Sequence, residues 1–119
     1  MADSLLVLIT KGPYGLEEAF AGARLALGGK VSGLMETSNV LLMGDGTLNA
    51  LKAQNHEAVA MPSNLAALQD IMDLEGEVYC VEPDLRQRVG DMEALEGVKM
   101  VTWAEARDIV KKHQLVNTF

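Results

Sequence analysis

The stretch 77-EVYCVEPDLRQRVG-90 carries the signals of one strand and one helix in a short segment. Residues 77–81 form an apolar run that is typical of a buried strand. Pro83 suits the first position of a following helix, where its missing N–H is not needed. Gly90 is of the residue type that most often follows the end of a helix. We therefore expect a strand at 77–81 and a helix from about Pro83 to Gly90.

The same order of strand, loop and helix recurs on both sides of this stretch. Continuous apolar runs predict three further strands, at 4–10, 39–43 and 98–102. Apolar residues at helical spacing predict four further helices, at 16–27, 47–54, 63–74 and 103–113. Residues 30–38 fit either an extension of the first helix or a loop with a short strand.

Several residues mark where the helices should begin or end. Gly28 and Gly29 are expected to end the first helix, and Thr47 is expected to cap the second. The sequence 102-TWAE-105 fits a capping box, in which a Thr hydroxyl and a Glu carboxylate satisfy two backbone N–H groups. The last helix should therefore begin at about Trp103.

The strands read as continuous apolar runs rather than as alternating apolar and polar residues. Such strands are buried on both faces, which predicts an α/β fold with a mostly parallel sheet and helices on both sides. The chain has 119 residues, and we expect residues 1–119 to form a single domain. A chain of this length buries about two thirds of its unfolded surface, enough for an ordinary core.

Composition excludes several classes of protein. The longest apolar run, 5-LLVLI-9, is far shorter than the roughly 20 residues of a membrane span. The first residues lack a basic segment and a cleavage pattern, which predicts a cytoplasmic protein. A net charge of −7 argues against direct binding of nucleic acid, and the basic group at 111–113 suits the end of a helix. The single cysteine excludes an internal disulfide.

Three loops should lie at the carboxyl ends of strands, where α/β sheets collect their ligands and reactive groups. The loop 11-KGPYG-15 could cradle a phosphate or form a plain turn, and it lacks both common phosphate-binding glycine motifs. Asp45, in 44-GDG-46, could hold a metal or simply favour a tight loop, since no second carboxylate is expected nearby. His56 and His113 are too isolated to suggest zinc.

Cys80 belongs to the third loop region, and the residues alone leave two interpretations open. A free cysteine near the end of a core strand is often just a small buried apolar residue. The start of the next helix, with Arg86 and Arg88 on it, would instead favour a reactive thiolate. Glu82 and Asp84 oppose that effect, because nearby negative charges disfavour a second one.

Separated pieces of the chain resemble the DsrE/DsrF and TusC/TusD group of small sulfur-relay proteins. The pieces are spread over nearly the whole sequence: 12-GPYG-15, 44-GDG-46 with a short helix to Gln54, 80-CVEPDLRQR-88 and the closing segment 113-HQLVNTF-119. Some features resemble the DsrF/TusC branch and others the DsrE/TusD branch. Glu82, Pro83 and Asp84 stand where small residues are common in the family.

The resemblance implies a flavodoxin-like sheet and a function in sulfur transfer without a cofactor. Cys80 would carry sulfur as a persulfide, for tRNA thiolation or sulfur oxidation. Arg86 or Arg88 would supply positive potential or contact a partner, and Asp45 would shape its loop. The partners implied are persulfide donor and acceptor proteins and, in a homo- or hetero-oligomer, DsrE/DsrH-like subunits.

Two other functions are compatible with the same residues. The first is a non-catalytic subunit of a DsrE/DsrF-type oligomer, in which Cys80 is packed and the acidic surface meets partners. The second is a nucleotide- or flavin-binding domain, because a fold does not dictate a function. Reactivity of Cys80 separates the first from a sulfur carrier, and absorbance of the purified protein tests the second.

Overall fold

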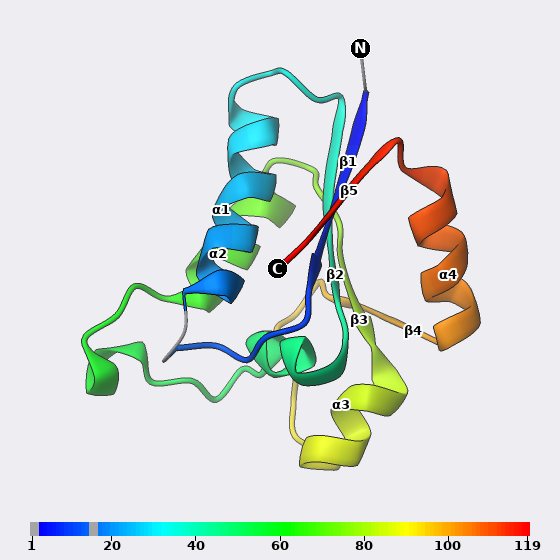
Figure 1. The fold of residues 1–119 in the computed structure, drawn as a ribbon. Helices are drawn as coiled ribbons and strands as arrows, with labels where there is room; N and C mark the ends of the chain where they lie inside the picture. Colours follow the sequence, from blue (N-terminus) through cyan, green and yellow to red (C-terminus); the bar gives the residue numbers. More distant parts are fainter. Residues whose placement is uncertain (1–2, 15–16) are drawn as a thin grey trace.

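The computed structural model describes residues 3–14 and 17–119, which form a five-stranded sheet flanked by helices (Figure 1). All neighbouring strands run parallel, in the order β4-β3-β2-β1-β5. The strands are β1 (Ser4–Ile9), β2 (Thr37–Leu42), β3 (Val78–Val81), β4 (Lys99–Val101) and β5 (Leu115–Thr118). The α-helices are α1 (Glu18–Val31), α2 (Asn64–Asp73), α3 (Glu82–Val89) and α4 (Trp103–Lys112), and the 3-10 helices are η1 (Gly44–Ala50) and η2 (His56–Val59).

The order of the strands explains why helices cover both faces of the sheet. From β1 to β4 the chain steps along the sheet in one direction, and from β4 to β5 it returns past β1. Crossovers between parallel strands are right-handed, so steps in opposite directions place their helices on opposite faces. Figure 1 shows this arrangement, with α1 and α2 on one side of the sheet and α4 on the other. The mostly parallel sheet with helices on both faces is confirmed.

The core has two layers, one on each face of the sheet. The larger layer lies under α1 and α2 and contains alternate residues of the strands, including Val7, Val40 and Cys80. The smaller layer lies under α4 and contains Leu6 and Leu41. Uninterrupted apolar strands are thus buried on both sides, as the sequence predicted.

Most predicted helix ends are confirmed, together with the strands that precede them. The hydroxyl of Ser63 caps α2, and the capping box of Thr102 and Glu105 begins α4. Gly90 ends α3 with a φ of 62°, a conformation that glycine adopts without strain. Pro83 is the second residue of α3 rather than the first, because α3 begins directly after β3 at Glu82.

The predicted end of the first helix is wrong. Helix α1 continues through Gly28 and Gly29 to Val31, and Gly33, with a φ of 74°, follows it. Gly29 serves close packing instead, since an added Cβ would lie 3.3 Å from the Ser38 hydroxyl. The predicted start, at residue 16, lies outside the described residues.

The helix predicted at 47–54 with Thr47 as its cap is also wrong. The structure has the 3-10 helix η1 at Gly44–Ala50, and Met43 occupies its N-cap position. The Thr47 hydroxyl lies inside η1 and donates to the carbonyl of Gly44 at 2.8 Å. Two glycines permit this tighter turn: Gly44 has a φ of 57°, and Gly46 lies against the backbone of Ile9.

Of residues 30–38, left open by the sequence, the first two end α1, 32–36 form the connecting turn, and the last two begin β2. The closing segment forms a strand, as the family resemblance implied, and β5 pairs with β1 at the edge of the sheet. In the part of the chain that the structure describes, no helix combines the length and the apolar character needed to span a membrane.

Candidate functional site

The carboxyl ends of β1, β2 and β3 lie side by side, and Cys80 sits at this edge of the sheet. It is the third residue of β3 and pairs in register with Leu42 of β2 and Met100 of β4. Its side chain belongs to the core layer under α1 and α2. The residue has no exposed surface. The sequence placed Cys80 at a strand end and left open whether it is buried, and the structure shows complete burial.

Two short elements pack together at the strand ends around Cys80. The 3-10 helix η1 follows β2 and contacts both β3 and α3. Helix α3 follows β3 directly, and its Leu85 side chain is completely buried in the same core layer as Cys80. Ala50, the last residue of η1, belongs to that layer too. Cys80, Leu85 and Ala50 thus belong to one apolar layer, to which both η1 and α3 contribute.

The burial of Cys80 controls the acidity of its thiol. Burial raises the pKa of Cys80 from 9.0 to about 12, because the charged thiolate loses its hydration. The guanidinium of Arg86 lowers this pKa, whereas the carboxylates of Asp84 and Glu82 raise it further. Of the two interpretations that the residues left open, this conformation favours the buried, protonated thiol. Cys80 is a protonated thiol at neutral pH.

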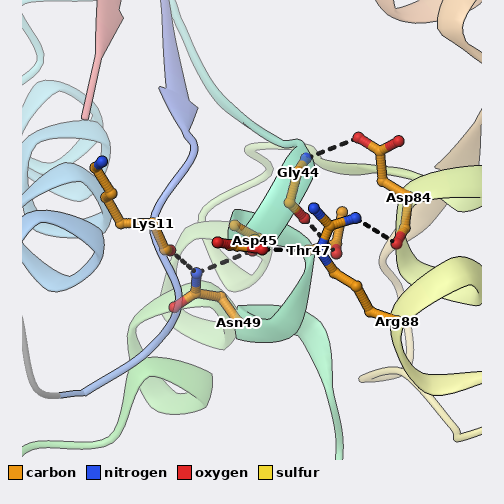
Figure 2. A network of polar contacts seen from close by, with 8 residues as sticks. Lys11, Gly44, Asp45, Thr47, Asn49, Asp84 and Arg88 are labelled. Carbon is orange, nitrogen blue, oxygen red and sulfur yellow. Dashed lines mark hydrogen bonds and ion pairs between the residues drawn. The ribbon is translucent and has the colours of Figure 1, made fainter.

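A polar network joins α3 to η1 at the surface above this core (Figure 2). The Asp84 carboxylate accepts a hydrogen bond from the Gly44 backbone N–H at 2.7 Å and another from the Trp103 indole at 3.2 Å. Arg88 donates from Nε to the Asp45 carboxylate at 2.9 Å and from Nη1 to the Asp84 carbonyl at 3.0 Å. We call the contacts of Asp84 and Arg88 with Gly44 and Asp45 the α3–η1 clasp.

The structure thus brings together two of the predicted supporting residues and separates the third. Asp45 and Arg88, 43 positions apart in the chain, form a direct ion pair. The Arg86 side chain instead donates to the backbone carbonyls of Gly90 and Met92, both at 2.9 Å. Arg86 therefore stabilises the end of α3, while its charge still acts on Cys80.

Sequence reasoning missed the residues that anchor η1. Asn49 is buried, and its amide donates to the carbonyls of Lys11 and Gly46, both at 2.9 Å (Figure 2). Buried Asn64 donates to the Asn49 side-chain oxygen at 2.7 Å. An asparagine in a tight loop after a strand is the signal that could have identified Asn49.

The first loop is joined to the same region by Tyr14. This residue has a φ of 66°, which is unusual for a residue other than glycine. Its hydroxyl donates to the Gln54 side chain at 2.8 Å, and the Gln54 amide donates in turn to the carbonyls of Asn49 and Leu51. These contacts hold the loop against the segment that follows η1. Residues 15 and 16 lie outside the described residues.

The two histidines lie apart from this site and from each other. His56 contacts the Met61 carbonyl through Nδ1 at 2.7 Å. His113 contacts the Ile109 carbonyl and the Asn39 side chain through its two ring nitrogens. Within residues 3–14 and 17–119, no three His, Cys, Asp or Glu side chains converge on one point as metal ligands would.

The fold and site define a class of small α/β protein in which a parallel sheet carries a single cysteine at the end of an inner strand. The chain belongs to the DsrE/DsrF-like family, whose sequence profile matches residues 3–116. This confirms the resemblance seen in the sequence. Membership supports a role in sulfur relay at the level of the family.

Two archaeal relatives are similar over nearly their whole length. The uncharacterized protein MJ0989 of Methanocaldococcus jannaschii is 32% identical over 114 residues, which cover 95% of this chain and 96% of that protein. The uncharacterized protein MK0008 of Methanopyrus kandleri is 30% identical over 118 residues, which cover 98% and 94% respectively. Neither name states an activity.

Solved structures support the fold. The crystal structure of the ychN protein from E. coli superposes with a TM-score of 0.87 at 21% identity and covers all of both chains. A conserved protein of unknown function from Bacteroides thetaiotaomicron, BT1422, gives a TM-score of 0.69 at 16% identity and covers 98% of this chain and 95% of its own. The flavodoxin-like α/β class is therefore confirmed.

Proposed function

We propose that this protein carries sulfane sulfur as a persulfide on Cys80 and passes it to a partner protein. The observation that supports this function is the position of the single cysteine of the chain at the carboxyl end of β3. Reactive groups of α/β proteins gather at this edge of the sheet. Membership in a family with a sulfur-relay role adds the chemistry.

The transfer consists of two displacements at sulfur. The Cys80 thiol loses its proton to solvent, and its thiolate attacks the outer sulfur of a donor persulfide. A new S–S bond forms on Cys80, the S–S bond of the donor breaks, and the donor thiolate leaves with that electron pair. An acceptor thiolate then attacks the outer sulfur on Cys80 and releases the Cys80 thiolate. Nothing is oxidised or reduced overall, so the step needs no cofactor.

In this proposal the neighbouring residues act on the ionisation and exposure of the Cys80 thiol, and none of them contacts the transferred sulfur atom. Arg86 favours the thiolate, while Asp84 and Glu82 oppose it. Arg88 and Asp45 act through the position of α3. The partners in this proposal are a persulfide donor protein, an acceptor protein with a cysteine, and DsrE/DsrH-like subunits of a homo- or hetero-oligomer. The end product, a thiolated tRNA or an oxidised sulfur compound, depends on those partners.

Mass spectrometry of the intact protein tests the transfer. After incubation with a persulfide donor, the wild-type chain should gain the mass of one sulfur atom, and a reductant should remove it. The Cys80→Ser variant, which keeps the size of the side chain, should gain none. Equal gain in the two proteins, or gain in neither, would contradict the proposal.

The complete burial of Cys80 favours a second function, that of a non-catalytic subunit in a DsrE/DsrF-type oligomer. In that case Cys80 is a packed core residue whose high pKa keeps it unreactive. Native protein would then take up no sulfur and would co-purify with homologues that carry an accessible cysteine. Sulfur uptake by the isolated chain would contradict this alternative.

A further inference from the structure

The burial of Cys80 requires that part of the site moves before any sulfur can be transferred. A thiolate must approach the S–S bond of its partner directly, and Cys80 has no exposed surface. Helix α2 contributes to the layer that holds Cys80, and at the strand end η1 and α3 contact β3 and each other. Which of them can move follows from how each one is held.

Helix η1 is held by buried contacts to the end of β1. Gly46 packs so closely that an added Cβ would lie 1.8 Å from the carbonyl oxygen of Ile9. The buried Asn49 amide ties η1 to the Lys11 carbonyl, and Asn64 of α2 holds the Asn49 side chain. The backbone N–H of Met43 donates to the Ile9 carbonyl just before η1 begins. Because these contacts are mostly buried, η1 is a fixed part of the site.

Helix α3 is held in a different way. Leu85 is its only buried residue, and the other positions of the helix are half-buried or exposed. Val89 packs against the same layer while partly exposed, and the polar bonds of the α3–η1 clasp, one partly buried and one exposed, join α3 to η1 (Figure 2). Gly90 follows the helix with a positive φ of 62°, and short surface elements with few buried contacts open most easily.

We propose that α3 is a lid over Cys80, held closed by the Asp84–Gly44 hydrogen bond and the Arg88–Asp45 ion pair, and that release of this clasp exposes the thiol. Opening swings Leu85 away from the core layer that it shares with Cys80. Water then reaches the sulfur and removes the main cause of its low acidity. The use of this motion for sulfur transfer rests on the proposed function, whereas the motion itself does not.

Alkylation of Cys80 by iodoacetamide measures the opening directly in the full chain. Cys80 is the only cysteine, so every modified molecule reports on this site. The reagent is neutral, so the charge of the lid neither attracts nor repels it, and the rate is compared at matched thiolate fraction because the thiolate is the reacting species. When closing is faster than alkylation, the rate is proportional to the population of the open state. Low urea concentrations then separate local opening, which exposes little surface, from global unfolding, which exposes much.

The variant Arg88→Gln removes the ion pair with Asp45 and keeps a polar side chain of similar length. Its alkylation rate should be about two- to fivefold that of wild type, in keeping with the loss of one partly exposed ion pair. The matched control is Lys99→Gln on β4, which breaks the surface ion pair between Lys99 and Glu77. This control should leave the rate unchanged. High salt should speed alkylation of wild type, by screening the pair, more than it speeds alkylation of Arg88→Gln.

Two results would overturn the lid. In one, alkylation of wild type depends on urea as steeply as global unfolding does. In the other, Arg88→Gln raises the alkylation rate only by the factor by which it lowers global stability. If Arg88→Gln does not fold, Asp45→Asn tests the same pair, because Asp45 is a surface residue whose amide replacement keeps the shape of the side chain.

Sulfur uptake from a persulfide donor, measured on the same variants, separates the lid from the proposed function. Alkylation that depends on the clasp, with no sulfur uptake, would support the lid and contradict the sulfur carrier. Sulfur uptake with an alkylation rate that Arg88→Gln leaves unchanged would support the carrier and contradict the lid.

Discussion

The two short elements packed at the strand ends around Cys80 differ in what holds them. Helix η1 is fixed by buried contacts between backbone and small side chains, such as the approach of Gly46 to Ile9. Helix α3 is fixed by one buried leucine, by the partly exposed Val89 and by partly buried and exposed polar contacts. Burial makes the loss of a contact costly, whereas exposed ion pairs contribute little. A fixed element, η1, and a weakly held lid, α3, can thus lie beside the same thiol.

The largest expected effect comes from a substitution in η1, the fixed element. Gly46→Ala should destabilise the protein by about 4 kcal/mol or more, because its Cβ would collide with the backbone of Ile9, which cannot be repacked. Urea unfolding measures the loss. The matched control is Gly28→Ala in α1, where an added Cβ meets nothing within 4 Å and should stabilise the helix by about 0.5–1 kcal/mol. Equal stability of Gly46→Ala and wild type would show that η1 is not fixed in this way.

The pH dependence of stability tests whether the Cys80 thiol is buried. The pKa of Cys80 is about 12 in the folded protein against 9.0 for a free thiol, so the folded state keeps its proton to higher pH. The contribution of the protonated Cys80 thiol to the free energy of unfolding is fully present below pH 9. It is lost as the pH rises from 9 toward 12, by at most about 4 kcal/mol.

Comparison with Cys80→Ala isolates this contribution. The difference in free energy of unfolding between wild type and Cys80→Ala should fall steadily above pH 9, as measured by urea unfolding across that range. Other groups titrate equally in both proteins and cancel. A difference that stays constant with pH would mean that the thiol is not enclosed.

Truncation of the lid's only buried side chain should give the next largest effect. Leu85→Ala should cost about 2–3 kcal/mol, since it loses buried surface and leaves a cavity beside the layer that holds Cys80. Alkylation of Cys80 should accelerate by more than global stability accounts for. Leu68→Ala in α2, also fully buried in that layer, is the matched control and should change alkylation only through global stability. The same behaviour in both variants would remove the distinction between α3 and the rest of the core.

The smallest effect concerns the clasp itself. Asp84→Asn keeps the shape of the side chain but replaces one of its two acceptor oxygens by a donor, so the bonds to Gly44 and Trp103 cannot both remain. We expect a loss of about 1 kcal/mol in urea unfolding. The pKa of Cys80 should also fall, because a negative charge that raises it is removed.

The exposed Asp108 of α4 provides the control for this variant. Asp108→Asn removes the same charge far from the clasp and should change neither stability nor the pH dependence of Cys80 alkylation. If the two variants behave alike, the bonds of Asp84 do not hold the lid.

Much of the fold could be predicted because its signals are local. The apolar run before Cys80, the proline at the start of α3 and the glycine after it marked one strand and one helix within a few residues. Capping chemistry placed the start of α4 in the same way. The errors occurred at glycines, whose meaning is not local: Gly29 and Gly46 serve close approaches to residues from other strands.

The candidate site could be predicted only in part. The sequence indicated Cys80, Asp45 and Arg88 one by one, because each lies beside a strand end or on the helix that follows. Their use as functional residues stays a proposal. The ion pair between Asp45 and Arg88 joins the helices that follow two different strands, and no local pattern encodes a contact over that separation. The roles of Asn49 and Trp103 were missed for the same reason.

The sequence by itself determined the alternation of strands and helices, the parallel sheet and the family, because these depend on short-range periodicity and on motifs along the chain. Only the tertiary structure decided the state of the thiol. The acidity of Cys80 depends on how much water reaches its sulfur, and that is set by Leu85 and the elements packed around it. Burial outweighs the neighbouring charges, so a residue that the sequence left balanced between core and nucleophile is, in the closed protein, a protonated core thiol.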